Sequence, residues 1–367
     1  MAFIRNTWYA AAWARELREE MLPRTILGEP IVLFRKTDGA IVALGNRCAH
    51  RFVPLHLGRL ENNVVECKYH GLKYDESGSC IFNPHGDGKI PPGARVKKYI
   101  VAERYGIVWI WMGEASRVDR SQIRDFTEFD DSGRFTFVTG YVHVAANYQL
   151  IADNLLDLTH GQYVHPLFTN AAGPATMEAD TSSEPGTVWA KFVRKNQYPN
   201  QYFQMLGYPK DQRGDHRNYM RWNAPGVLLL DVGMTSVGGS PSEGISIPTA
   251  HLLTPETLTS THYLWGMARN FRLNDASFSA QLLETGISVF ENEDKPIIEA
   301  QQRAMGASDD LFGMTPALLQ TDRAALRARR LLERMIRQER GEVVEPHAIA
   351  GLAQEDIGPG AATSGDA

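Results

Sequence analysis

Cysteine is scarce in this chain of 367 residues, with three in all, and this odd count does not support a framework of disulfide bonds. We therefore expect a reducing compartment. The N-terminal segment, residues 1–12, lacks the long apolar core of a secretory signal, which predicts a cytoplasmic protein. The most apolar short run, Ile107–Met112, is far too short to span a bilayer.

Two further absences limit the function. The net charge is −5 and there is no block of basic residues, so nothing points to nucleic acid as a partner. The chain also lacks a G-x-G-x-x-G motif opening a βαβ unit, and it lacks the four-cysteine spacing of a plant-type ferredoxin. It therefore carries no reductase of its own. Its apolar content of 43% is enough for about two domains.

Residues 1–117 are predicted to be rich in β-structure. Short apolar or alternating runs are separated by turn-forming pairs such as Asp38-Gly39 and Ser77-Gly78. So many short strands indicate a small sandwich or barrel. The expected strands are Ile31–Phe34, Ile41–Leu44, Val64–Cys67, Lys97–Ala102 and Ile107–Trp111.

Two loops of this region carry metal-binding residue types. Cys48 and His50 form a C-x-H pattern, and Cys67 and His70 form a C-x-x-H pattern after sixteen intervening residues. Two thiolates and two imidazoles suit either zinc or a Rieske [2Fe–2S] centre, in which two histidines replace two cysteines on one iron. Each loop offers one cysteine and one histidine, so two facing loops can supply a matched pair to each iron. This pattern favours the Rieske centre. Cys80 has no partner at ligand spacing and is expected to be a packing residue.

A second concentration of such residues lies in Asn147–Pro166, where apolar positions predict a buried helical face. Asn154, Asp157 and His160 follow one another at intervals of three residues and would share one side of that helix. Charged side chains beside a buried face need a partner. A metal ion would provide one.

His165 follows His160 by five residues, which on an unbroken helix turns the two imidazoles about 500° apart, so that they diverge. Gly161 and Pro166 allow the helix to end or loosen between them. We therefore expect the two rings to converge. Two histidines and one carboxylate make the facial triad that holds Fe(II) with open positions for O2.

The third ligand is expected downstream, after a helix whose N-cap is predicted around Asn274-Asp275. The acidic run that follows contains Glu293 and Asp294, which would point about 100° apart on a helix, so only one of them can ligate. Pro296 would bend the helix toward the site.

With both cluster loops and the run from Asn154 to His165, the chain resembles the α-subunits of Rieske non-haem iron oxygenases over nearly its whole length. Three other segments resemble the O-demethylase branch that includes vanillate O-demethylase and dicamba monooxygenase: Asn6–Tyr9, His251–Thr257 and Trp265–Phe271. Asp294 matches the third iron ligand of the family, and an assisting role for Glu293 stays open. The resemblance implies a [2Fe–2S] cluster on Cys48, His50, Cys67 and His70, and a mononuclear Fe(II) on His160, His165 and Asp294.

The resemblance also implies an α+β fold, in which an N-terminal Rieske β-domain precedes a catalytic domain with helices capping a mostly antiparallel sheet. We expect the Rieske domain over residues 1–117, the catalytic iron domain over 118–345 and a disordered tail over 346–367. Further expected elements are strands at Trp189–Val193, Val227–Met234 and His262–Met267 and a last amphipathic helix at Pro316–Arg340.

In this family the subunits form a head-to-tail homotrimer, and the cluster of one subunit feeds the iron of the next. The resemblance implies that Asp157 accepts hydrogen bonds from His70 of the partner subunit and from His160 of its own. Asp157 and Asn154 are therefore the expected catalytic residues beside the metal ligands. Electrons are expected from a separate NAD(P)H-dependent reductase, with or without a ferredoxin.

By the same resemblance, the substrate pocket is expected to include Leu155, Leu230, Asp231, His251, Leu282 and Thr285. Leu230 and Thr285 stand where the dicamba enzyme has an amide and an indole that help hold a carboxylate. The vanillate enzyme has an acidic residue near the position that Asp231 occupies in this sequence. A largely apolar pocket would also suit a neutral aryl ether or an anilide.

The expected function is that of a terminal oxygenase component, which uses O2 to O-demethylate a substituted aromatic compound. N-dealkylation of a neutral N-alkyl anilide or amide, or hydroxylation of a methyl group, would use the same iron chemistry. A Rieske electron carrier would need no second iron, yet His160, His165 and Asp294 are all present. A zinc-binding interaction module is a further alternative.

Overall fold

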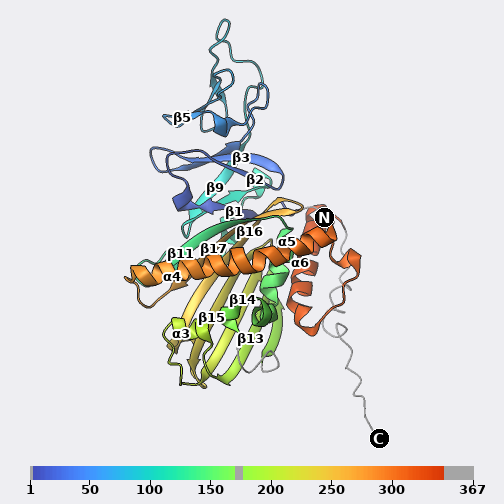
Figure 1. The fold of residues 1–367 in the computed structure, drawn as a ribbon. Helices are drawn as coiled ribbons and strands as arrows, with labels where there is room; N and C mark the ends of the chain where they lie inside the picture. Colours follow the sequence, from blue (N-terminus) through green and yellow to red (C-terminus); the bar gives the residue numbers. More distant parts are fainter. Residues whose placement is uncertain (1–2, 170–176, 343–367) are drawn as a thin grey trace.

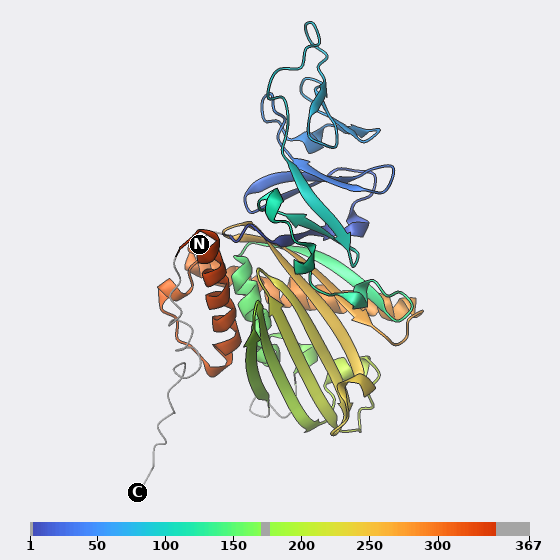
Figure 2. The same ribbon diagram turned by 180° about the vertical axis from the view of Figure 1, so that it is seen from behind.

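The computed structural model describes residues 3–169 and 177–342 (Figure 1). Two regions rich in β-structure follow one another along the chain, and helices gather around the second (Figures 1 and 2). The tail predicted at 346–367 lies outside the described residues. Across the two described ranges, no helix is both long and apolar enough to cross a membrane.

The N-terminal region contains two antiparallel sheets. The first has six strands in the order β1-β10-β9-β4-β3-β2, and the second has four in the order β5-β6-β7-β8. The strands are β1 (Trp8–Trp13), β2 (Leu22–Ile26), β3 (Glu29–Arg35), β4 (Ile41–Gly45), β5 (Arg59–Glu61), β6 (Val64–Glu66), β7 (Lys73–Tyr74), β8 (Cys80–Phe82), β9 (Lys98–Arg104) and β10 (Ile107–Trp111).

The five predicted strands are all present, with small shifts at their ends. β10 spans the predicted residues, whereas the strand predicted at Val64–Cys67 ends at Glu66. β1 was not predicted, because three of its six residues are alanine, a weak strand former. All six residues of β1 are nevertheless buried. Tertiary packing therefore outweighs local preference there.

The C-terminal region is built on one seven-stranded antiparallel sheet, in the order β11-β17-β16-β15-β14-β13-β12. The predictions at 189–193, 227–234 and 262–267 are confirmed, because each lies within one of these strands. The strands are β11 (Thr136–Val144), β12 (Glu178–Glu184), β13 (Thr187–Gln197), β14 (Gly214–Asn223), β15 (Val227–Ser236), β16 (Ile245–Thr257) and β17 (Ser260–Arg269).

Helices cover one face of this sheet (Figure 1). As predicted, Asp275 caps the first helix of the long helical element by accepting a hydrogen bond from the Phe278 backbone at 2.9 Å. That element runs from α4 (Ala276–Ile287) through a π-helical segment, η10 (Ser288–Asp294), into α5 (Lys295–Met305). The remaining α-helices are α1 (Tyr148–Leu156), α2 (Gly161–Val164), α3 (Gln201–Met205) and α6 (Arg323–Glu339).

The last helix is shorter than the one predicted at Pro316–Arg340. Leu318 and Leu319 remain exposed, so no packed face stabilises a helix at these residues. The helix α6 begins where its apolar side chains, such as Leu326 and Leu332, become buried.

Trp265 of β17 brings the long helix close to the sheet. A side chain at Gly140 on the neighbouring strand, or at Gly286 on α4, would place its Cβ 2.2 Å or 2.5 Å from the Trp265 ring. Only glycine fits at these two positions. The helix and its π-helical extension are thereby held directly above the inner face of the sheet.

The two regions share a hydrophobic cluster, to which Trp109 contributes from β10 and Leu264 from β17. Thr254 also donates a hydrogen bond to the Ala10 carbonyl at 2.7 Å. Seen from behind, the four-stranded sheet lies at the opposite end of the molecule from the seven-stranded sheet (Figure 2). The two predicted metal sites therefore belong to different regions of the molecule, and the cluster loops lie at its far N-terminal end (Figure 2).

Candidate active site

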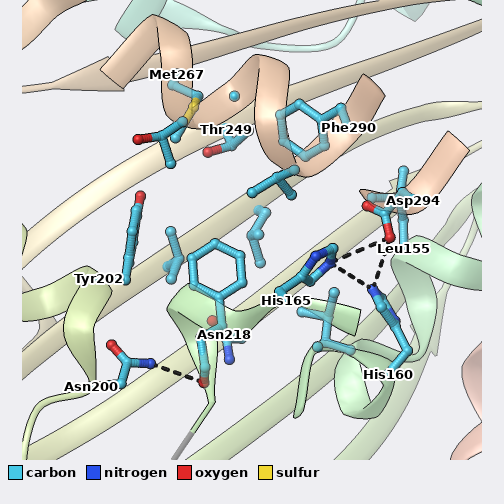
Figure 3. Close-up of a pocket in the computed structure, with 18 of the residues that line it drawn as sticks. Leu155, His160, His165, Asn200, Tyr202, Asn218, Thr249, Met267, Phe290 and Asp294 are labelled. Carbon is cyan, nitrogen blue, oxygen red and sulfur yellow. Dashed lines mark hydrogen bonds and ion pairs between the residues drawn. The ribbon is translucent and has the colours of Figure 1, made fainter. Parts of the chain in front are cut away.

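Three side chains of types that can ligate a metal come from two distant segments and converge at one end of a pocket in the C-terminal region (Figure 3). His160 Nε2 lies 3.3 Å from His165 Nε2. Asp294 Oδ1 lies 3.3 Å from His165 Nε2 and 3.5 Å from His160 Nε2. Atoms this far apart can share one ion at ordinary bond lengths of about 2.0–2.2 Å. The structure thus brings together the three residues that the sequence predicts as iron ligands.

The other nitrogen of each imidazole is already engaged. His160 Nδ1 lies 2.6 Å from the Asp157 carbonyl oxygen, and His165 Nδ1 lies 2.7 Å from Glu293 Oε2. A carbonyl and a carboxylate only accept, so each Nδ1 carries the proton and each Nε2 keeps a free lone pair. Ser288 in turn donates to Glu293 Oε1 at 2.8 Å. Supported rings of this kind are typical of histidines that ligate a metal.

Electrostatics keep the carboxylate ionised. Burial opposes ionisation of Asp294, but its contacts with His160 and His165 hold its pKa well below the usual range. Burial would likewise lower the pKa of His165, yet Asp294 and Glu293 outweigh it and raise that pKa. Two neutral imidazoles and one carboxylate are the donor set that suits Fe(II) with open positions.

The backbone makes the two rings converge by leaving the helix twice. Helix α1 ends at Asp157, whose φ is −119° and ψ 89°. The chain re-enters helical structure and leaves it again at His165, with φ −112° and ψ 99°. The residue before Pro166 is expected to be extended in this way. Gly161, which was expected to permit the break, is itself helical, with φ −58° and ψ −22°, and the chain leaves the helix at His165 instead.

The π-helical segment η10 sets the two acidic residues around one ring. Glu293 contacts Nδ1 of His165, and Asp294 contacts Nε2 of the same imidazole. π-helical turns inside longer helices often occur at functional sites. Pro296, the second residue of α5, follows directly. Only Asp294 faces the shared position, and Glu293 assists by orienting His165.

The two predicted catalytic residues flank the triad in different ways. Asn154 Nδ2 donates to Asp294 Oδ1 at 3.3 Å. Asp157 was expected to accept the His160 hydrogen bond through its carboxylate, but its main-chain carbonyl takes that bond instead. The carboxylate caps the next turn, because its Oδ1 accepts from the Thr159 backbone and hydroxyl at 3.0 Å and 2.6 Å.

The two cluster loops face each other in the N-terminal region. The ring centroids of His50 and His70 are 4.6 Å apart, and Cys48 Sγ lies 3.2 Å from the Tyr74 hydroxyl. Burial raises the pKa of Cys67. Hydrogen bonds from the backbone N–H groups of Tyr69 and His70 act to lower it. Such N–H groups aimed at a sulfur favour the thiolate that a cluster needs. Both cysteines are buried and free of disulfides.

A pocket of about 870 Å³, counting its open mouth, extends from the triad along the inner face of the sheet. Its wall includes four of the predicted residues: Leu155, Leu230, His251 and Thr285. His251 is 1% exposed, and burial lowers its pKa to about 3, so it is a neutral imidazole. Its Nδ1 lies 2.6 Å from the Tyr263 hydroxyl, and its Nε2 is buried without a partner among the described residues.

Two predicted pocket residues lie elsewhere. Asp231 points to the opposite face of the sheet, where it pairs with Arg217 at 2.8 Å and accepts from Ser246 at 2.6 Å. Side chains alternate along a strand, so Leu230 and Asp231 cannot both face the pocket. Leu282 is fully buried in the hydrophobic core instead of the pocket wall.

Several polar residues of the pocket were not predicted. Arg194, His216 and Asn218 all line it. The predicted strand ended at 193, whereas β13 continues to Gln197. Alternation from Val188 along that longer strand would have placed Arg194 on the inner face.

Two family models match the chain: the Rieske [2Fe-2S] domain over residues 7–99, and the vanillate O-demethylase oxygenase C-terminal domain over residues 144–338. The chain is 37% identical to the iron-sulfur subunit of a toluene-4-sulfonate monooxygenase system of Comamonas testosteroni, covering 92% of this chain and 99% of the relative. It is 35% identical to the oxygenase component of a chloroacetanilide N-alkylformylase of Rhizorhabdus wittichii, covering 92% and 97%.

Among solved structures, dicamba monooxygenase bound to dicamba superposes with a TM-score of 0.86 at 35% identity, over 93% of this chain and all of that one. The fold predicted from the sequence, a Rieske domain followed by an antiparallel sheet with helices, is confirmed. The chain belongs to the family of Rieske oxygenases that carry the vanillate O-demethylase type of C-terminal domain.

Proposed function

We infer that the chain is the oxygenase component of a multicomponent monooxygenase that oxidatively dealkylates a substituted aromatic compound. The observation that carries this inference is the convergence of two imidazole Nε2 atoms and one carboxylate oxygen, each ring being held through its other nitrogen. The proposed ligands are His160, His165 and Asp294 for a mononuclear Fe(II), and Cys48, His50, Cys67 and His70 for a [2Fe–2S] cluster.

An iron centre of this kind, when bound and supplied with electrons, activates O2 for insertion into a C–H bond. The residues of the chain perform three other tasks. The Asp157 carbonyl and Glu293 hold the two rings, apolar side chains such as Leu155 and Phe290 exclude water, and the pocket presents an alkyl group to the triad.

Oxidation of a methyl group bonded to oxygen needs no further catalytic residue. One atom of O2 enters the C–H bond and gives a hemiacetal, which collapses to formaldehyde and the phenol. The other atom leaves as water, and two electrons and two protons are consumed. The same oxidation beside nitrogen gives a hemiaminal, which releases an aldehyde and the dealkylated amine or amide.

N-dealkylation of a neutral anilide is the second candidate. The relative from Rhizorhabdus wittichii acts on chloroacetanilides, and the pocket wall includes apolar residues such as Leu230 and Val232. Hydroxylation of an aryl methyl group is a third form of the same chemistry, and the relative from Comamonas testosteroni acts on toluene-4-sulfonate.

The partners follow from the position of the two sites. The cluster loops lie at the far end of the N-terminal region, away from the C-terminal region that holds the triad, which favours electron transfer between subunits of a head-to-tail homotrimer (Figure 2). The proposed division is a Rieske domain over 1–117 and a catalytic domain over 118–345. Asp157, at the end of α1, would link the triad to the cluster of the next subunit. Electrons would come from a separate reductase, with or without a ferredoxin.

The test is aldehyde release by the purified holoenzyme with a surrogate reductase. The panel holds vanillate, methoxybenzoates related to dicamba, neutral anisoles and N-alkoxyalkyl anilides. Formaldehyde from a methoxy compound, absent in His165→Ala, supports O-demethylation. Aldehyde from anilides alone would move the assignment to N-dealkylation. Reduction of the cluster without any substrate oxidation across the panel would contradict the oxygenase proposal.

A further inference from the structure

One buried cation of the pocket has no counter-charge. Arg194 is 6% exposed and lines the pocket. Among the described residues, its guanidinium has no ion pair or hydrogen bond, and its Nε is buried without a partner. Burial lowers its pKa. An unpaired buried charge is costly, so it persists only where something else compensates it.

The other buried arginines of the catalytic region have partners within the chain. Arg269, which is fully buried, donates to three backbone carbonyls and to the Ser279 hydroxyl. Arg217 forms a two-pronged ion pair with Asp231, at 2.8 Å and 3.0 Å. Arg329 forms a similar pair with Asp153, in which Nε lies 2.9 Å from both carboxylate oxygens. The contrast indicates that the partner of Arg194 is not part of the chain.

Arg194 lies three inner-face rows along the sheet from His251, whose ring packs against Phe290 in the segment that carries Asp294. In the sheet Arg194 pairs with His216, and the His216 ring packs against Phe203 of α3 with centroids 4.6 Å apart. The neighbouring residue, Tyr202, lies across the pocket from the metal-binding residues in Figure 3. A molecule that fills the pocket would therefore contact Arg194 with one end and present the other end to the triad.

The surroundings of Arg194 contain donors and no competing acid. Burial, followed by the charge of Arg194, lowers the pKa of His216 to about 3, so this histidine is neutral. Its Nε2 lies 3.2 Å from Asn218 Oδ1 and donates to it. This leaves the Asn218 amide nitrogen without a partner among the described residues. Within the described wall, the only carboxylate is Asp294, in the triad.

We propose that Arg194, together with Asn218, binds an anionic oxyacid group of the substrate, a sulfonate or a carboxylate. The inference rests on the proposed function only in taking this pocket as the substrate pocket. This proposed anchor for the anion is a different residue from Leu230 and Thr285, which stand where the dicamba enzyme holds its carboxylate. Because Arg194 and the triad lie apart in the pocket, the substrate would carry the anionic group and the oxidised carbon at separate positions of its ring.

The test uses three matched ligands: 4-methoxybenzenesulfonate, 4-methoxybenzoate and the neutral 4-methoxybenzenesulfonamide. Their dissociation constants are measured by calorimetry on the holoenzyme, with formaldehyde release measured in parallel. Arg194→Met removes the charge and keeps a long side chain, and Arg194→Lys keeps a charge. Lys191→Gln is the control, because Lys191 lies three residues away on the same strand and its ammonium lies over the Trp189 and Tyr219 rings.

We expect one or both anions to bind the wild type at least about tenfold more tightly than the sulfonamide, as for a hydrogen-bonded charge pair. Arg194→Met should abolish this difference, Arg194→Lys should retain part of it, and Lys191→Gln should leave it unchanged. The anion whose affinity depends more on Arg194 identifies the group. Thermal unfolding gives a second readout, since Arg194→Met should keep the melting temperature but lose the rise that the anion produces.

Equal affinity for anions and sulfonamide, a uniform loss of all three in Arg194→Met, or no saturable anion binding would overturn the proposal. These outcomes are separate from failure of the oxygenase function. Anion binding that depends on Arg194, without formaldehyde release, would support the anion subsite and reject the dealkylase function. Formaldehyde release from neutral compounds alone would support the dealkylase function and reject the anion subsite.

Discussion

The two proposed metal sites are built in opposite ways. The cluster site comes from two loops less than twenty-five residues apart in sequence, and His50 is exposed at the surface. The triad comes from segments more than a hundred residues apart, and His165 and Asp294 are 4% and 5% exposed. In the triad each imidazole also has an acceptor that sets its orientation.

The difference corresponds to a division of labour. A centre that receives electrons from another protein benefits from lying near the surface. A centre that oxidises a C–H bond benefits from a pocket that excludes water and limits side reactions. The same burial makes the triad depend on supporting residues, because unpaired charges there would be costly. Variants that alter only one of the two sites therefore test this difference between them.

The largest effect is expected from removing one triad ligand. His165→Ala should lower turnover by about a thousandfold or more, as expected when a group at the reacting centre is lost. Mononuclear iron should be lost while the cluster keeps its visible absorbance and its electron paramagnetic resonance signal. Metal analysis and spectroscopy of the same sample check this.

The complementary variant is Cys67→Ser, which should lose the cluster and keep the triad able to bind iron. Loss of both centres in either variant would contradict their independence.

Asp157→Asn should show the next largest effect. The amide oxygen keeps the cap on Thr159, and the main-chain carbonyl still holds His160. Iron and cluster content should therefore stay normal, whereas coupled turnover should fall by about 10- to 100-fold, as for other residues that support a metal site. The measurement is product formed per NADH consumed. Wild-type coupling in this variant would rule out the bridging role.

Glu293→Gln should weaken the buried site alone. Replacing the carboxylate removes the charged acceptor of His165, and iron affinity should fall by about 10- to 100-fold. Competition with a chelator measures this affinity. Glu284→Gln on the exposed side of α4 is the matched control and should bind iron as the wild type does. Equal affinities in the two variants would show that the Glu293 contact is dispensable.

The smallest effect on catalysis is expected from Asp231→Asn. Its side chain lies on the far face of the sheet from the pocket and pairs with Arg217. The Michaelis constant should stay within about twofold of the wild type, whereas stability should decrease because Arg217 loses its counter-charge. Kinetics and thermal unfolding separate the two effects. A large rise in the Michaelis constant would return Asp231 to the pocket.

The sequence predicted those parts of the molecule that depend on local spacing. The C-x-H and C-x-x-H loops, the break near Pro166 and the cap at Asp275 are set by neighbouring residues. The fold and the choice of Asp294 came from resemblance to a family. β1 was not predicted, because its alanines are weak strand formers and become buried only through packing against β10, which is distant in sequence.

The rest depends on contacts that no local pattern encodes. The π-helical segment changes the directions in which the Glu293 and Asp294 side chains point. The angle of about 100° expected between them on a regular helix therefore does not predict that both contact His165. Strand alternation was available in the sequence and would have separated Asp231 from Leu230. The unpaired state of Arg194 is visible only when the whole pocket is assembled.

The central claim is that electrons from the exposed cluster are used at the buried triad. The most direct measurement is a single turnover: the holoenzyme is reduced, the reductant is removed, and O2 and a methoxy substrate are added. We predict that the cluster becomes oxidised as formaldehyde forms in the wild type. In His165→Ala the cluster should remain reduced and no formaldehyde should appear. Formaldehyde from His165→Ala at the wild-type level would contradict the claim.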